Sequence, residues 1–173
     1  MPGIISKASI ARAVKASFDE EVAFVSTLVK APSPNPYTPQ DSPLHAAVEG
    51  EVPTLIHDKL KEIGLAPKYV GASRERMNVV AEWGEKRGRS VLMLNGHMDT
   101  AALDVRQSGG SSSGIVRDGK IYGHGVLDMK ATLAAYIYAV KALHSLDIKL
   151  SGKLLLAFVV DEESGACSKL GTH

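Results

Sequence analysis

Apolar side chains recur at helical spacing in three parts of the chain. The first stripe predicts a helix over residues 8–30, which ends at the proline-rich stretch 32–39 because proline has no N–H group to continue the helical ladder. The second predicts a helix over 43–63 that closes at Gly64, and the third a helix over 129–146.

Short apolar runs predict the strands. Residues 78–83 and 91–94 are expected to be adjacent strands joined by the charged turn 84–89. The runs 91–94 and 154–160 are almost wholly apolar, which is typical of strands covered on both faces. Asp118-Gly119 predicts a hairpin over 115–122.

The order of these elements is helix, helix, strands, helix, strand. Such an order predicts an α/β sandwich with a mixed sheet. The Gly- and Ser-rich stretch 106–114 between them has no helical or strand periodicity and is expected to be a loop.

Composition narrows the class of protein. The 173 residues are 45% hydrophobic and 23% charged, and the net charge of +1 gives no electrostatic case for a nucleic-acid or membrane partner. No apolar run approaches the roughly 18–20 residues that span a bilayer. A single cysteine, Cys167, excludes an internal disulfide. We expect a cytoplasmic protein, although residues 1–18 are basic and free of acidic side chains, as mitochondrial presequences are.

Polar residues that could bind a metal or take part in catalysis follow the two most buried predicted strands. His97 and Asp99 come directly after 91–94, and in an extended chain their side chains point the same way. An imidazole beside a carboxylate suits a metal ligand oriented by a second group. The plain alternative is a loop histidine beside a solvated aspartate.

Asp128 stands where the third helix is expected to begin. Aspartate is a favoured helix N-cap, and its two oxygens could equally bridge two cations, so both interpretations stay open. The nearby His124 is ambiguous, and we do not assign it as a ligand.

Asp161, Glu162 and Glu163 form an acidic triplet directly after 154–160. Adjacent carboxylates at a buried strand end repel one another unless cations neutralise them, whereas a solvated acidic turn is the alternative. Gaps of about 30 residues separate His97, Asp128 and Glu162, enough for strand–helix–strand crossovers that bring the motifs together.

These motifs together resemble the metallohydrolase family that includes acetylornithine deacetylase, succinyl-diaminopimelate desuccinylase, aminoacylase and glutamate carboxypeptidase. The resemblance extends from the first helix and the segment 31–36 through 96–100 and 122–130 to the acidic triplet. It implies a three-layer α/β/α zinc-peptidase-like sandwich, with residues 1–173 as the N-terminal portion of the catalytic domain. It also implies a cis peptide bond after Asp128.

The resemblance further implies the site. His97, Asp128 and Glu163 bind two Zn²⁺ ions, for which Co²⁺ or Mn²⁺ could substitute, and Asp128 bridges them. Asp99 orients His97, and Glu162 is the general base on the zinc-bound water. The parent would cleave an amide in an N-acyl amino acid or small peptide, and full-length relatives suggest a homodimer.

The family also has a further acidic ligand, a histidine ligand near its C-terminus and a lid or dimerisation domain between them. We expect these to be absent from 1–173, with His173 wrongly placed to be the missing ligand and Cys167 to be a buried helix residue. Each zinc would then keep only two of its usual three protein ligands. The alternative is therefore that this chain alone is an inactive fragment with weak metal binding.

Overall fold

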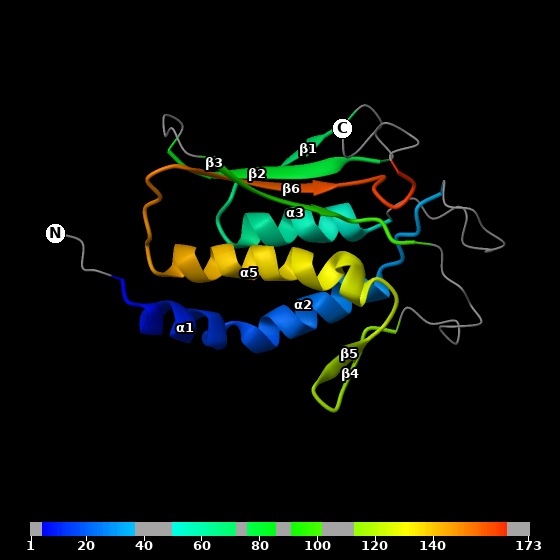
Figure 1. Ribbon diagram of the computed structural model, residues 1–173, viewed down its shortest axis with the longest axis horizontal. Helices are drawn as coiled ribbons and strands as arrows, with labels where there is room; N and C mark the ends of the chain where they lie inside the picture. Colours follow the sequence, from blue (N-terminus) through cyan, green and yellow to red (C-terminus); the bar gives the residue numbers. More distant parts are fainter. Residues whose placement is uncertain (1–4, 37–49, 72–75, 86–90, 102–112, 166–173) are drawn as a thin grey trace.

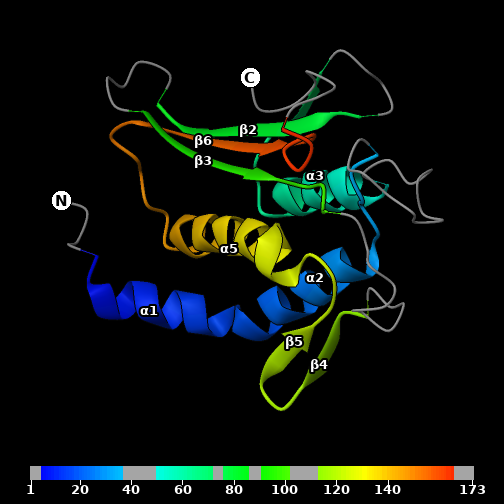
Figure 2. The same cartoon turned by 45° about the vertical axis from the view of Figure 1, so that its right-hand side comes forward.

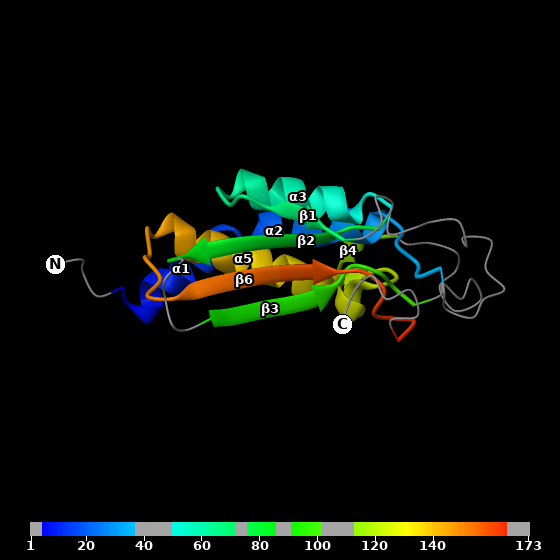
Figure 3. The ribbon, with the colours of Figure 1, turned by 90° about the horizontal axis from the view of Figure 1, so that it is seen from above.

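A mixed four-stranded sheet organises the computed structural model, which describes residues 5–36, 50–71, 76–85, 91–101 and 113–165. The strand order is β1-β2-β6-β3. Strands β3 and β6 run parallel, whereas β2 is antiparallel to both of its neighbours (Figure 3). The strands are β1 (Lys68–Val70), β2 (Asn78–Gly84), β3 (Val91–His97) and β6 (Lys153–Val159).

The described helices all lie on one side of this sheet. Helices α3 (Val52–Glu62) and α5 (Ala131–Ser145) lie against the strands, and α1 (Lys7–Ala16) and α2 (Phe18–Lys30) lie beneath α5 (Figures 1 and 2). The core between the layers is apolar and fully buried, and its largest members include Leu28, Ile56, Leu60, Leu133, Ile137, Leu156 and Phe158.

The expected α/β class with a mixed sheet is confirmed. Its helices, in the part of the chain that the structure describes, cover one face of the sheet (Figure 1). None of the described helices has the length and hydropathy to cross a membrane.

The first predicted helix is in fact two helices. A break at Ser17 separates α1 from α2, so the prediction of one helix over 8–30 is wrong. The Ser17 hydroxyl donates to the carbonyl oxygens of Ala13 and Val14, at 3.4 and 3.2 Å, and so competes for the backbone acceptors at the end of α1. The apolar residues keep their helical spacing across the break, so the sequence pattern did not indicate that the helix is interrupted at Ser17.

Helix α3 ends as expected at Gly64. The Gly64 N–H donates to Lys61 O and the Leu65 N–H to Leu60 O, both at 3.0 Å, while Gly64 itself has φ of +90°. This paired pattern is a Schellman motif, which favours glycine because its backbone is left-handed. Residues 43–49 of the predicted helix lie outside the described residues.

Strands β2 and β3 are not neighbours, because β6 lies between them. The expected direct pairing is therefore wrong, and so is the expectation that β3 is covered on both faces. β3 is an edge strand of the described sheet, where Val91 and Leu92 are 60% and 61% exposed. A short linker signals a hairpin locally, whereas the pairing of β3 with β6 depends on the crossover through α5.

That crossover brings the carboxyl ends of β3 and β6 to the same end of the sheet (Figure 3). The kinked turn η1 (Val126–Lys130) precedes α5 at this end (Figure 1). The hairpin of β4 (Ile115–Arg117) and β5 (Lys120–Tyr122) is confirmed and projects from the body on the helical side (Figure 2). Asp118 and Gly119 form its turn with positive φ angles of 52° and 70°.

Candidate metal centre

Three of the predicted site residues converge where β3, β6 and η1 meet. His97 is the last residue of β3, Asp128 lies in η1, and Glu163 follows the end of β6. One potential ligand atom from each lies within 4.8 Å of the other two. The structure therefore brings together the imidazole and carboxylates that the sequence suggested, and their metal-binding role stays a prediction.

The imidazole of His97 is buried and held at both nitrogens. Its Nδ1 lies 2.9 Å from the backbone oxygen of Asp99, and its Nε2 lies 3.1 Å from Asp128 Oδ1. A carbonyl oxygen only accepts, so Nδ1 carries a proton, and in the neutral ring Nε2 offers its lone pair toward the carboxylates. The Asp99 carboxylate is farther away, 3.5 Å from Nδ1, so the nearer contact is with the Asp99 backbone.

The surroundings of His97 favour its protonated form. Burial on its own lowers the pKa of the imidazole, but the contacts with Asp99 and Asp128 outweigh this effect and raise the pKa to about 9. A cation is thus preferred at the His97 ring, which lies close to the carboxylates of Asp99, Asp128 and Glu162. Glu162 Oε2 lies 3.8 Å from His97 Nε2. The same environment suits a metal cation in place of the proton.

Asp128 does not cap α5. Helix α5 begins at Ala131, its N-cap position is Lys130, and no side chain forms the capping hydrogen bond. Asp128 instead has non-helical backbone angles, φ −129° and ψ 95°, and turns its carboxylate toward His97 while its side chain stays 74% exposed. Of the two interpretations of this residue, the cap is excluded. The cis peptide bond expected between Asp128 and Met129 is confirmed.

The two residues after Asp128 fix η1 to the rest of the protein. The Met129 sulfur accepts a hydrogen bond from the backbone N–H of His97, at 3.3 Å. Lys130 Nζ, almost fully buried, donates to the carbonyl oxygens of Leu28 and Ala31 at 2.9 and 2.7 Å. Burial lowers the pKa of Lys130 to about 8. The turn that carries Asp128 is therefore tied both to β3 and to the end of α2.

Behind His97 lies a buried polar network that sequence reasoning did not assign. Asp99 accepts the backbone N–H groups of Glu162 at 3.3 Å and Glu163 at 3.1 Å. Asn35 Nδ2 donates to Asp99 Oδ2 at 2.7 Å and to Asp161 Oδ1 at 3.3 Å. A polar residue, Asn35, inside a proline-rich segment was the one feature of the sequence that could have pointed to this network. The sequence does not show, however, that this segment reaches the ends of two strands.

The carboxyl groups of Asp99 and Asp161 are stabilised mainly by hydrogen bonds. Burial on its own raises the pKa of Asp99, but contact with His97, the Asn35 amide and the Glu163 N–H together lower it, so the carboxyl is ionised. Arg76 Nη1 lies 3.6 Å from Asp161 Oδ1, and the Ser164 hydroxyl donates to the same oxygen at 2.7 Å. For Glu163, burial raises the pKa of the side chain.

Other candidates lie elsewhere. His124 Nε2 lies 2.8 Å from Ala101 O and is not part of the described three-residue cluster. Cys167 and His173 lie outside the described residues.

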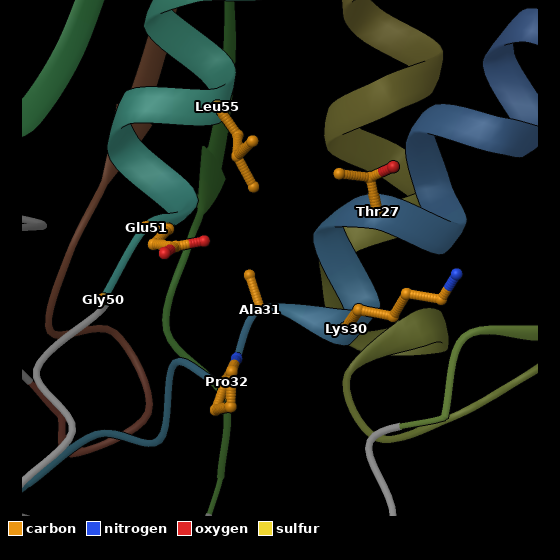
Figure 4. A pocket seen from close by; sticks show the side chains of 7 residues that line it. All are labelled: Thr27, Lys30, Ala31, Pro32, Gly50, Glu51 and Leu55. Atoms are coloured by element: carbon orange, nitrogen blue, oxygen red, sulfur yellow. The ribbon is translucent and has the colours of Figure 1, made fainter.

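A separate cavity of about 430 Å³ opens between the end of α2 and the start of α3 (Figure 4). None of the predicted site residues lines it; its lining residues are Thr27, Lys30, Ala31, Pro32, Gly50, Glu51 and Leu55.

Solved structures share this fold. The chain superimposes on the dipeptidase Dug1p from Saccharomyces cerevisiae with a TM-score of 0.76 and 15% identity, over 94% of this chain and 36% of that one. Human carnosine dipeptidase 1 gives a TM-score of 0.70 and 21% identity, over 91% and 35% of the two chains. At these identities the likeness is one of fold.

Sequence relatives agree. The N-formyl-4-amino-5-aminomethyl-2-methylpyrimidine deformylase of Halalkalibacterium halodurans is 34% identical over 151 residues, 85% of this chain and 34% of the relative. The succinyl-diaminopimelate desuccinylase of Polynucleobacter necessarius is 28% identical over 139 residues, 72% of this chain and 36% of the relative. The chain thus spans about a third of the length of these relatives.

The family itself is given by a match over residues 93–172, which include His97, Asp128 and the acidic triplet. The description of the matching family is peptidase family M20/M25/M40. Together with the deformylase and desuccinylase relatives, this match confirms the resemblance to the metallohydrolase family that includes succinyl-diaminopimelate desuccinylase. Residues 93–172 therefore match peptidase family M20/M25/M40, and the similarity to the deformylase extends over 85% of the chain.

Proposed function

We propose that the chain is the N-terminal portion of the catalytic domain of a metal-dependent amide hydrolase. Its substrate would be an N-acyl amino acid or a small peptide. The names of the relatives support amide hydrolysis, since one is a deformylase of an N-formylated aminomethylpyrimidine and the other is a desuccinylase of diaminopimelate. The structural neighbours are dipeptidases. The observation that carries the proposal is the convergence of His97, Asp128 and Glu163 within 4.8 Å.

The donor set fits the metal expected from the sequence. One imidazole nitrogen and two carboxylates are the ligand types of catalytic zinc sites, and Co²⁺ or Mn²⁺ accepts the same donors. The partly exposed Asp128 has oxygens available for two ions. The Nδ1 proton of His97 is already engaged with Asp99 O, which leaves Nε2 for the metal. In this proposal His97, Asp128 and Glu163 would hold the Zn²⁺ ions.

When bound, the ions would supply Lewis acidity to the attacking water and to the amide carbonyl. Glu162 is the proposed base: its side chain is half exposed, with Oε2 3.8 Å from His97 Nε2. The carboxylate takes a proton from the water as the water oxygen attacks the carbonyl carbon. It then returns that proton to the amine nitrogen as the C–N bond breaks.

The backbone on both sides of the base is fixed. Asp99 accepts the N–H groups of Glu162 and of Glu163, so a single buried carboxylate holds the proposed base and a proposed ligand in one turn. Asp99 acts here as a positioning residue for Glu162 and Glu163 as well as for His97.

Replacing the base tests the proposal. In the full-length protein, Glu162→Ala should lower kcat for an N-acyl amino acid by at least about 100-fold, since general-base catalysis contributes about 10²–10⁴-fold. Zinc content should stay unchanged, because Glu162 is not one of the three ligands. Steady-state kinetics and metal analysis of the same preparation check both expectations.

Glu82→Gln is a suitable control. Glu82 is an exposed glutamate on β2 that pairs with Lys153 at 3.0 Å, away from the site. This variant should keep normal turnover. Normal turnover by Glu162→Ala would instead show that another group accepts the proton.

A second candidate concerns the 173-residue chain on its own. Two ions sharing Asp128 would each have only two ligands among the described side chains, whereas catalytic zinc sites usually have three. This count favours weak metal binding and no activity for the isolated chain. The two candidates differ in the number and strength of the zinc sites that this chain forms by itself.

A further inference from the structure

We propose that Asn35 is a positioning residue that holds the backbone of the Glu162–Glu163 turn in place through Asp99. The inference deepens the proposed function and rests on it for its catalytic consequence. Its structural part can be tested without metal or substrate. Asn35 comes from the segment after α2, far in sequence from the two carboxylates that it contacts.

The problem that Asn35 solves is the proximity of two buried carboxylates. Asp99 and Asp161 follow the neighbouring parallel strands β3 and β6, and both side chains have no exposed surface. Two carboxylates this close and this well buried repel each other strongly when both are ionised, because little water screens them. Arg76 Nη1 lies 3.6 Å from Asp161 Oδ1.

The Asn35 amide is suited to lie between them. A carboxylate can only accept hydrogen bonds, and an amide nitrogen carries two N–H donors in one plane. Nδ2 gives one to Asp99 Oδ2 and one to Asp161 Oδ1, at 2.7 and 3.3 Å. Aspartate at this position would have no donors and add a third negative charge. Leucine would have a similar shape and no donors.

The segment that carries Asn35 is itself held firmly. The Asn35 N–H donates to Thr100 O at 2.9 Å, and the Thr100 N–H donates to Ser33 O at 2.8 Å. These bonds form a short parallel bridge between the proline-rich segment and the chain just beyond Asp99. The amide of Asn35 therefore reaches both carboxylates from a fixed backbone.

The effect passes to the site through Asp99. Oδ2 of Asp99, which accepts the Asn35 amide, also accepts the Glu163 N–H, and Oδ1 accepts the Glu162 N–H. If the amide is lost, the carboxylate is free to move away from Asp161, and these two backbone bonds lengthen. Asp161 has φ of +69°, a backbone conformation that is unfavourable for a residue other than glycine, so surrounding contacts must hold the turn that it begins.

Hydrogen exchange of the metal-free protein tests whether Asn35 acts on the Glu162–Glu163 turn through Asp99. Asn35→Leu should speed exchange of the Glu162 and Glu163 amides by at least about tenfold relative to the amides of α5, which report general opening of the fold. Ser33→Ala is the matched control, because Ser33 is equally buried, two residues away, and its Oγ has no hydrogen-bond partner. It should leave the ratio unchanged.

Asn35→Ser keeps the test valid if Asn35→Leu does not fold. A serine hydroxyl has one donor, so it can serve one carboxylate only, and the exchange ratio should rise by a smaller factor. Equal acceleration across α5 and the Glu162–Glu163 turn would overturn the inference, since it would mean that Asn35 only stabilises the fold. An unchanged ratio in both variants would overturn it as well.

Cobalt titration tests whether Asn35 also supports metal binding. In the variant that folds, Co²⁺ affinity should fall by about 10–100-fold relative to Ser33→Ala, the range found when groups that support metal ligands are removed. Faster exchange together with normal Co²⁺ binding would support the positioning of the turn and count against the proposed metal site. Normal exchange with weakened Co²⁺ binding would overturn the role of Asn35 and leave the metal site standing.

Discussion

Lys130 shows how single residues behind the cluster support it. The last carbonyls of a helix lack partners within that helix, and here Leu28 and Ala31, at the end of α2, receive two hydrogen bonds from one buried ammonium group. Lys130 lies two residues after Asp128, so the same contact fixes the end of η1. One side chain thus satisfies a helix end and anchors the turn that presents the proposed bridging carboxylate.

Removing this ammonium should destabilise the chain. Lys130→Met keeps the aliphatic stem but leaves two buried carbonyl oxygens without their donor, which costs about 1–3 kcal/mol for each such group. Urea unfolding should therefore show a loss of at least about 1 kcal/mol in the free energy of unfolding. Lys153→Met, which breaks the ion pair with Glu82, is the control and should cost about 1 kcal/mol or less. Equal losses in the two variants would contradict the role given to Lys130.

Among the elements, the helical layer is joined by a polar cluster around Glu20. Glu20 in α2 accepts hydrogen bonds from Tyr138 Oη at 2.9 Å and from Lys141 Nζ, both in α5, and from Lys59 Nζ in α3 at 3.4 Å. The hydrogen bond from Lys141 is the main cause of a lowered pKa for Glu20, which burial partly opposes. Three helices that are separate in sequence therefore meet at one carboxylate.

This cluster makes the packing of the helices sensitive to acid. Because the pKa of Glu20 is lower in the folded state than its usual value of 4.5, its stabilisation is present above that pH and is lost as the pH falls through the folded pKa. Glu20→Gln should lower Tm at pH 7, and the difference from the unmodified chain should shrink as the pH falls below 4.5. Since Glu20 is 42% exposed, we expect a difference of about 1 kcal/mol or less at pH 7. A difference that stays constant with pH would contradict this explanation.

Local patterns in the sequence predicted the elements better than their pairing. The cap at Gly64 and the hairpin at Asp118-Gly119 follow from the conformations these residues prefer, and both are confirmed. The placement of β6 between β2 and β3 depends on a long-range crossover that short-range spacing does not encode.

The same distinction holds at the candidate site. Strand ends carrying polar residues pointed to His97 and Glu163, because the carboxyl ends of parallel strands meet at one edge of the sheet. The role of Asn35 could not be predicted, since its contacts depend on where the proline-rich segment folds back onto the sheet. Side-chain types indicated the chemistry, whereas the tertiary fold determined which groups support it.

At the scale of the whole molecule, the candidate site is assembled from four segments far apart in sequence. They are the stretch after α2, the end of β3, the turn η1 and the end of β6. Because no single segment supplies more than part of the cluster, metal binding should depend on the complete fold. Metal binding is therefore also the property that reports most directly on whether His97, Asp128 and Glu163 form a metal centre.

Calorimetric zinc titration of this chain tests the assignment of this metal centre. The chain should bind zinc saturably, and Asp128→Asn should weaken the binding by at least about tenfold, because the proposed bridging carboxylate loses its charge. Asp118→Asn, in the turn of the β4–β5 hairpin, is the control and should bind as the unmodified chain does. Two tight sites would rule out the weak-binding alternative, and weak binding that still depends on Asp128 would favour it. No zinc binding, or binding that Asp128→Asn leaves unchanged, would contradict the assignment of His97, Asp128 and Glu163 as a metal centre.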